Sequence, residues 1–264
     1  MEKKIALMTG GSSGIGLQTA IALRDRGCTV YELSRRESDT PGITHLGADV
    51  SDEAQTAAAI KKVLENEGRL DILICCAGSG ISGAAEFTDN ADARALLEVN
   101  LFGAVNCCKA AVPAMRRQGR GVILCVGSVA GAIPIPFQAW YSVTKAAVGS
   151  YAGALRNEVA PFGIEVSCIL PGDIKTGFTA ARRKSEAGDD VYQGRIRRSV
   201  AVMEHDEQNG MSADFAGRYI ASLALRGHLK PEYAVGLKYK FFVMLARLLP
   251  CRALSALVKT IYAK

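Results

Sequence analysis

The stretch KIALMTGGSSGIG, residues 4–16, joins a short apolar run to a glycine-rich loop. Residues 4–8 are apolar enough to form a buried parallel strand. The glycines then let the backbone turn tightly beneath a pyrophosphate, and residues 17–26 are expected to form a helix whose N-terminal N–H groups face that phosphate. By itself the pattern fits nucleotide binding or an ordinary turn between a strand and a helix, so its context decides.

Length and composition favour one α/β domain over residues 1–264. The chain has 264 residues, 49% of them apolar, which can fill one large core, and it shows no linker or internal repeat. Short apolar runs predict strands at 5–8, 29–33, 44–47, 70–76, 121–126 and 165–170, with a seventh near 233–235. Helical stretches between them predict right-handed crossovers and a Rossmann-type, doubly wound parallel sheet flanked by helices, with ligands at the strand carboxyl ends.

The eight cysteines are expected to be reduced thiols of a cytoplasmic protein, because the sequence begins without a signal peptide. Cys75, Cys125 and Cys168 lie inside apolar runs, and the adjacent pairs Cys75-Cys76 and Cys107-Cys108 lack metal-ligand spacing. We expect small buried side chains and no metal site.

Residues 226–264 form a basic, apolar C-terminal extension. They hold eight Lys or Arg and one Glu, a net charge of +7, whereas the whole chain carries +6. The segment is too short and too charged to span a bilayer. Two interpretations stay open: a helix that covers the substrate pocket or a subunit interface, which we favour, or a surface that meets an anionic membrane or a partner. The basic residues lack interleaved base-stacking aromatic residues, so no nucleic acid is expected.

Tyr141 and Lys145 are four residues apart and would lie on one face of a helix. A free tyrosine has a pKa of about 10, so a tyrosine base needs help near neutral pH. The Lys145 ammonium is expected to lower that pKa. Ser128 precedes this pair and could make a turn or hold a substrate oxygen.

The chain resembles the short-chain dehydrogenase/reductase family over residues 9–176, about two thirds of its length. The matching pieces are TGGSSGIG at 9–16, Asp49-Val50, CCAG at 75–78, NLFG from Asn100, GSVAG around Ser128, YSVTK at 141–145 and PGDIKT at 171–176. The resemblance implies hydride transfer between a carbinol or carbonyl carbon and a nicotinamide. The C-terminal extension is most similar to the hydroxysteroid, retinoid and long-chain-lipid members of the family.

The resemblance implies a catalytic set of Asn100, Ser128, Tyr141 and Lys145 and no metal. Tyr141 would be the general acid/base, Lys145 would also bind the nicotinamide ribose, and Asn100 would fix a water that joins Lys145 to solvent. It further implies cofactor contacts from Gly10, Ser12, Ser13, Gly14, Ile15, Gly16, Asp49, Val50, Ala77, Gly78, Tyr141, Lys145, Pro171, Gly172, Ile174 and Thr176. Where the family usually has NNAG this chain has CCAG, which puts the bracing of that strand in doubt.

The end of the second predicted strand favours NADP(H) over NAD(H). Ser34 stands where NAD enzymes place an acid, and Arg35 and Arg36 offer guanidinium groups to a 2′-phosphate. Glu32 would share a strand face with Ser34 and leaves some NAD use conceivable.

Substrate choice is expected to lie in residues 177–210, a mobile lid, and in an apolar pocket built from residues 130–137, Phe178 and the extension. The Arg/Lys clusters at 182–184 and 195–198 are expected to be solvated. The predicted reaction interconverts a secondary alcohol and a ketone on a hydroxysteroid or similar lipid, with reduction favoured. The alternatives are a 3-ketoacyl-carrier or CoA reductase and a non-catalytic NADP-binding sensor. A homodimer or homotetramer through residues 106–117 and 141–159 is expected, and peripheral membrane contact stays open.

Overall fold

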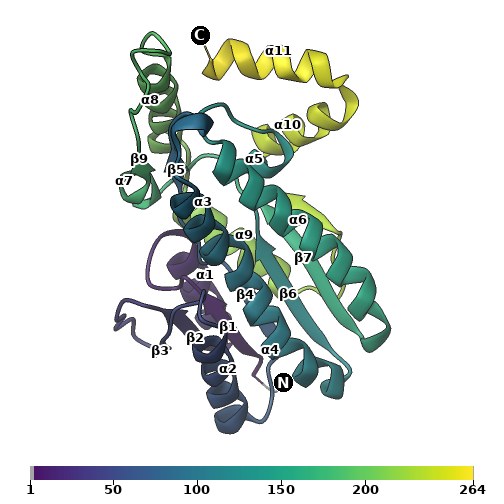
Figure 1. The fold of residues 1–264 in the computed structure, drawn as a ribbon. Coiled ribbons are helices and arrows are strands. Elements are labelled where there is room, and N and C mark those ends of the chain that lie inside the picture. Colours follow the sequence, from purple (N-terminus) through teal and green to yellow (C-terminus); the bar gives the residue numbers. More distant parts are fainter. Residues whose placement is uncertain (1–2, 264) are drawn as a thin grey trace.

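A seven-stranded, all-parallel sheet forms the centre of the computed structural model, which describes residues 3–263 (Figure 1). Its strands lie in the order β3-β2-β1-β4-β6-β7-β11. They comprise β1 (Ile5–Thr9), β2 (Thr29–Ser34), β3 (Ile43–Gly47), β4 (Ile72–Cys75), β6 (Gly121–Val126), β7 (Ile164–Leu170) and β11 (Glu232–Ala234). The predicted fold class is confirmed, and the seventh strand, β11, forms close to its predicted position and lies at an edge of the sheet.

Helices cover both faces of the sheet, which explains why its strands are continuous apolar runs. Along β1, Ile5 and Leu7 point into one core and Ala6 and Met8 into the other. The first core packs α2 (Glu53–Glu67), α4 (Gly103–Gln118) and α6 (Ala139–Val159), and the second packs α1 (Gly14–Arg24) and α9 (Ala213–Ala224). Helix α1 begins three residues earlier than predicted, directly at the glycine loop.

A nearly continuous helical run, Asn90–Gln118, consists of α3 (Asn90–Leu97), a π-helical segment (Glu98–Phe102) and α4. By length and composition it could cross a membrane. In this fold it is a core helix, because Cys107, Ala111 and Met115 are fully buried against the sheet.

The polypeptide after β7 builds a second level above the carboxyl ends of the strands (Figure 1). It contains α7 (Phe178–Ala181), α8 (Arg195–Gln208), α10 (Leu237–Leu248) and α11 (Cys251–Tyr262). Short strands tie it down: β9 (Arg183–Lys184) pairs with β5 (Ile81–Ser82), and β10 (Met211–Ser212) pairs with β8 (Ile174–Lys175). The remaining short helices are Ala85–Phe87, α5 (Val129–Ala132) and Ala160–Phe162. The predicted lid therefore contains helices, and its mobility stays a prediction.

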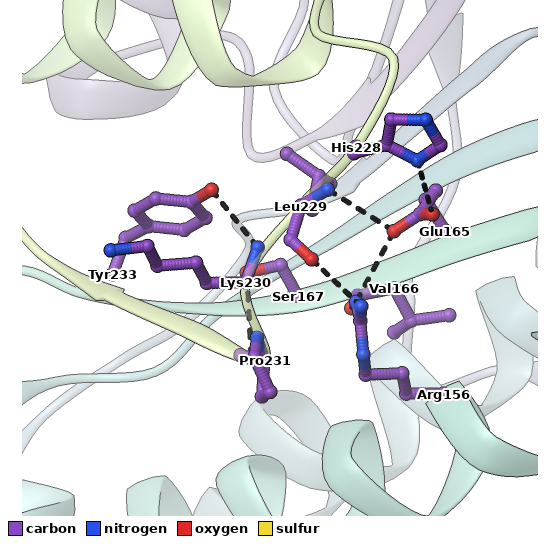
Figure 2. A network of polar contacts seen from close by, with 9 residues as sticks. All are labelled: Arg156, Glu165, Val166, Ser167, His228, Leu229, Lys230, Pro231 and Tyr233. Carbon is purple, nitrogen blue, oxygen red and sulfur yellow. Dashed lines mark hydrogen bonds and ion pairs between the residues drawn. The ribbon is translucent and has the colours of Figure 1, made fainter.

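A polar network anchors the start of the C-terminal extension to the sheet (Figure 2). Arg156 of α6 donates to the Val166 carbonyl at 2.6 Å and to the Leu229 carbonyl at 2.7 Å. The Glu165 carboxylate pairs with Arg156 at 3.3 Å and accepts from the Leu229 N–H at 3.2 Å. The network fixes the loop that leads into β11, and hence the point from which α10 leaves the sheet.

Candidate active site

A cavity of about 810 Å³ lies at the carboxyl ends of the strands, where the strand order reverses between β1 and β4. This is the place at which doubly wound sheets bind ligands. Its lining contains Ser128, Tyr141 and Lys145 and every residue predicted to contact the cofactor. Asn100 of the catalytic set lies just behind this lining. The structure thus brings the predicted residues together, while their individual roles stay predictions.

The glycine loop forms a cradle suited to a pyrophosphate. Gly10 has a φ of +69°, and a Cβ there would lie 2.9 Å from the Ala77 Cα; a Cβ on Gly16 would lie 2.1 Å from the Gly10 oxygen. Only glycine fits either position. At the start of α1, Ser13 makes no side-chain capping bond within the described residues, and the first turn has no acid. The helix N-terminus therefore suits an anion.

The β4 end is braced from β1, which removes the doubt raised by the Cys75-Cys76 pair. The Thr9 hydroxyl accepts from the Cys76 N–H at 3.1 Å and from the Ala77 N–H at 3.0 Å. This backbone lines the cavity, so Thr9 holds it at the ribose position that the resemblance implies.

Asn100 sits in the π-helical segment, a type of irregularity often found at functional sites. Its Oδ1 accepts from the Ser79 N–H at 2.8 Å, and its Nδ2 donates to the Ser79 carbonyl and the Thr144 hydroxyl, both at 3.0 Å. The side chain is buried and joins the loop after β4 to α6. The structure gives Asn100 a bracing role, and the water that it was predicted to fix stays a prediction.

Ser128 is held at the end of β6 by two bonds. It is the N-cap of α5 and accepts from the Ala130 N–H at 3.1 Å, while its hydroxyl lies 3.4 Å from the Pro171 carbonyl. The serine also hydrogen bonds to the Tyr141 phenol. Its turn-making and oxygen-holding roles are therefore compatible.

The Tyr141 side chain is half-buried, and its phenol is a weaker acid than usual, contrary to the expectation of a lowered pKa. Burial raises the pKa of Tyr141 to about 12, and the hydrogen bond to Ser128 offsets part of that rise. The Lys145 Nζ lies 5.8 Å from the Tyr141 ring centroid and donates to the Val126 carbonyl at 2.9 Å. Burial also lowers the pKa of Lys145. The ammonium thus lies over the ring face, and the expected lowering is wrong for this arrangement; the phenol stays protonated near neutral pH.

At the adenosine end of the cavity, the Arg35 side chain is exposed and the Glu32 side chain is buried. Ser34 and Glu32 share a strand face as predicted, with the Ser34 hydroxyl 3.3 Å from a Glu32 oxygen. Glu32 is buried, bonds to His45 and is not among the described lining residues. The Arg35 side chain is 71% exposed and reaches only to 3.6 Å from Asp49. Its guanidinium is therefore available to a 2′-phosphate.

Asp49 is held ionised at the same end. Burial opposes ionisation, but hydrogen bonds from Ser51 and the charge of Arg35 hold the pKa of Asp49 below its usual value. A carboxylate in this state can accept from an amino group, as the resemblance implies for adenine.

The opposite end of the cavity has an apolar wall built largely by the extension. Its lining includes Ile133, Ile135, Phe178, Met203, Phe242, Leu245, Leu254, Leu257, Val258 and Ile261. Tyr239 of α10 donates to the Asp173 carboxylate at 2.6 Å, and so fastens the extension above the cavity. The extension thus covers the cavity, in agreement with the interpretation favoured from the sequence.

Arg182 of the predicted lid is buried, so the expectation of a solvated cluster is wrong for this residue. Its guanidinium pairs with Glu207 of α8, which also accepts from the Thr179 hydroxyl at 2.6 Å. Glu207 and Asp173 line the cavity but were not assigned from the sequence. Asp173 lies within the PGDIKT stretch and could have been found there; nothing in the sequence marks Glu207.

Three cysteines that are distant in sequence meet in the core. The sulfur atoms of Cys75, Cys108 and Cys125 lie within 4.8 Å of one another and are buried. Bonds from neighbouring thiols, and then burial, raise the pKa of Cys75 well above its usual value. All eight cysteines are free thiols. The absence of a metal site stays a prediction.

Comparisons with known proteins agree with this geometry. The sequence profile of the short chain dehydrogenase family matches residues 4–187. A 3-ketodihydrosphingosine reductase of Bacteroides thetaiotaomicron is 38% identical over 229 residues, 86% of this chain and 85% of that protein. Human 17-beta-hydroxysteroid dehydrogenase type 1 is 34% identical over 67% of this chain and 59% of its own. The crystal structure of a short-chain dehydrogenase from Streptomyces avermitilis superposes with a TM-score of 0.83 at 27% identity, covering 98% of this chain and 96% of that one.

Proposed function

Because the chain belongs to the short-chain dehydrogenase/reductase family of oxidoreductases that act on CH–OH groups, we propose that it is an NADPH-dependent reductase of lipophilic ketones. One observation carries the proposal: the protonated Tyr141 stands in a single cavity between a glycine-lined end and an apolar end. A cofactor and a lipid substrate would meet at that phenol.

The residues divide the work of carbonyl reduction among them. When bound, the nicotinamide supplies the hydride for the carbonyl carbon. The Ser128 hydroxyl holds the carbonyl oxygen, and Tyr141 transfers its proton to that oxygen, which completes the alcohol. The buried Lys145 ammonium is held by the Val126 carbonyl at 2.9 Å and would contact the nicotinamide ribose. Asn100 bonds the loop after β4 to α6. These bonds would hold the cofactor-binding loop and the Tyr141 phenol in a fixed relative position.

The apolar wall supports a lipid substrate. Both curated relatives described above are named for lipophilic substrates, a ketosphingoid base and a hydroxysteroid. The first covers more of both chains, so a long-chain ketone such as 3-ketodihydrosphingosine is the substrate we propose first, with a ketosteroid second.

The rival 3-ketoacyl-carrier reductase is less well supported. Its carrier would dock on the basic cluster of the lid, yet Arg183 pairs with Asp92, Lys184 with Glu204 and Arg197 with Asp189. With Arg182 paired to Glu207, four of the six cations already have a carboxylate partner, which leaves less charge for a carrier phosphate. A non-catalytic NADP sensor would not need the assembled Ser128, Tyr141 and Lys145.

The test is NADPH oxidation by the purified protein with 3-ketodihydrosphingosine, a 17-ketosteroid, a small ketone and a 3-ketoacyl thioester. We expect the lipid ketones to be reduced with the highest kcat/KM. Turnover confined to the thioester would establish the carrier alternative instead. Tight NADPH binding without turnover of any ketone would establish the sensor.

We also propose a cytoplasmic homodimer or homotetramer. Phe102, next to α4, and Val143 on α6 are 45% and 48% exposed, and these helices offer a surface that a second copy could cover by two-fold symmetry. The free cysteines support the cytoplasm. Light scattering at low salt should give twice or four times the 28.0 kDa chain mass; a monomer would contradict this proposal.

A further inference from the structure

Helix α10 is apolar on two faces, and only one of them is covered. Tyr239 is buried over the cavity, and Val243 is buried in the core beside the sheet. A second row, Leu237, Phe241, Met244 and Leu248, runs along the other side of the helix at spacings of four, three and four residues. These side chains, here called the outer stripe, are 83%, 53%, 50% and 73% exposed. A surface helix normally carries polar residues on such a face.

The charges that α10 and α11 themselves carry are of one sign. Residues 237–263 contain no Asp or Glu, but they contain Lys238, Lys240, Arg247, Arg252 and Lys259. Of these, Arg247 pairs with Glu232 of β11. Two lysines have their ammonium groups over aromatic rings, with the Lys240 Nζ 5.5 Å from the Tyr219 ring centroid and the Lys238 Nζ 5.2 Å from the Tyr239 ring centroid. Exposed apolar side chains on a helix whose own charges are all cations match the interface of an anionic lipid bilayer.

The outer stripe lies on α10, and the wall of the cavity reaches solvent on the next helix, α11. Helices α10 and α11 form a pair at one end of the molecule, set apart from the sheet (Figure 1). Leu257 and Ile261 of α11 line the cavity and are nevertheless 43% and 46% exposed, so the apolar wall reaches solvent here. A ligand leaving a bilayer at α10 would meet this wall first.

A second copy of the chain fits the outer stripe poorly. Two-fold pairing through α10 would bring Lys238 and Lys240 toward their own counterparts, and like charges at close range oppose association. Anionic headgroups meet the same cations with favourable sign.

We propose that the outer stripe docks the protein on anionic membrane surfaces and presents the cavity entrance to the lipid phase. The docking proposal depends only on the exposed outer stripe of α10 and on the cations that α10 and α11 carry. The delivery of a lipid ketone into the cavity rests on the proposed function.

Docking is tested by cosedimentation of the full-length protein with vesicles of phosphatidylcholine, with or without phosphatidylglycerol. We expect binding to the anionic vesicles, weakened by added salt. The double substitution Phe241→Asn with Met244→Asn should reduce that binding by about tenfold or more, since each side chain loses its apolar burial. Phe162→Asn is the matched control, because Phe162 is 40% exposed in the short helix Ala160–Phe162, outside the extension, and it should bind as the unaltered protein does.

Failure to bind anionic vesicles, or equal binding by the double variant, would overturn the docking proposal. If neither the unaltered protein nor the double variant binds vesicles, and the double variant has a lower oligomeric mass, the outer stripe is an interface with a second copy of the chain. The vesicle measurement needs no substrate, so it stands apart from the test of activity. Delivery is tested with a ketone held in vesicles and a small soluble ketone: the double variant should slow only the former, and equal rates on both would refute delivery.

Discussion

Tyr141→Phe should lower kcat for ketone reduction by about two to four orders of magnitude, the usual contribution of a positioned general acid. The substitution removes one hydroxyl from a half-buried ring whose centroid lies 5.7 Å from that of the Phe178 ring, and leaves the ring in place. NADPH binding should change only a few-fold, because the glycine loop and Arg35 are untouched. Steady-state rates with the best substrate, together with NADPH fluorescence titration, measure the two effects separately.

The pKa of Tyr141 sharpens this expectation. At about 12 it keeps the phenol protonated throughout the neutral range, so the loss should be equally large at pH 6 and pH 8. Tyr151→Phe is the matched control, since it makes the same change on the same helix outside the cavity lining. It should keep normal turnover. Turnover by Tyr141→Phe above about a tenth of normal would exclude this phenol as the main proton donor.

The sheet could be predicted from sequence because its strands are buried on both faces. Each then appears as a continuous apolar run, and the helices between them leave few choices of connection. The glycine loop was equally readable, since the space beside Gly10 and Gly16 admits no side chain. The predicted ends of the elements were less accurate, since the strand predicted at 70–76 is Ile72–Cys75 and the first helix begins at Gly14.

The electrostatics of the site could not be predicted in this way. The pairing of Arg182 with Glu207 joins residues 25 positions apart, and only the packing of α7 against α8 brings them together. The pKa of Tyr141 depends on how deeply α6 is buried and on which acceptor Lys145 reaches, and the four-residue spacing does not determine either. The meeting of Cys75, Cys108 and Cys125 likewise depends on how α4 packs on β4 and β6.

Arg35→Ala should weaken NADPH binding by about tenfold to a hundredfold, the effect of losing charge-assisted hydrogen bonds to one phosphate. NADH binding should be almost unchanged, since NADH lacks that phosphate. The nearest acid on the same strand, Glu32, is committed to His45 and should not compete for the ribose. Fluorescence titration with both cofactors gives the ratio directly.

Arg36→Ala is the matched control, because it removes the same charge from the next residue of the same loop. It should weaken NADPH binding less, if Arg35 is the principal phosphate contact. Neither substitution should lower Tm appreciably, because the only ion pair lost, between Arg35 and Asp49, spans 3.6 Å at an arginine that is 71% exposed, where such pairs contribute little. Equal losses of NADPH and NADH affinity would mean that Arg35 shapes the loop and does not read the phosphate. Unchanged NADPH affinity would mean that Arg35 does not determine the preference for NADPH, and that Ser34 and the end of β2 would have to determine it.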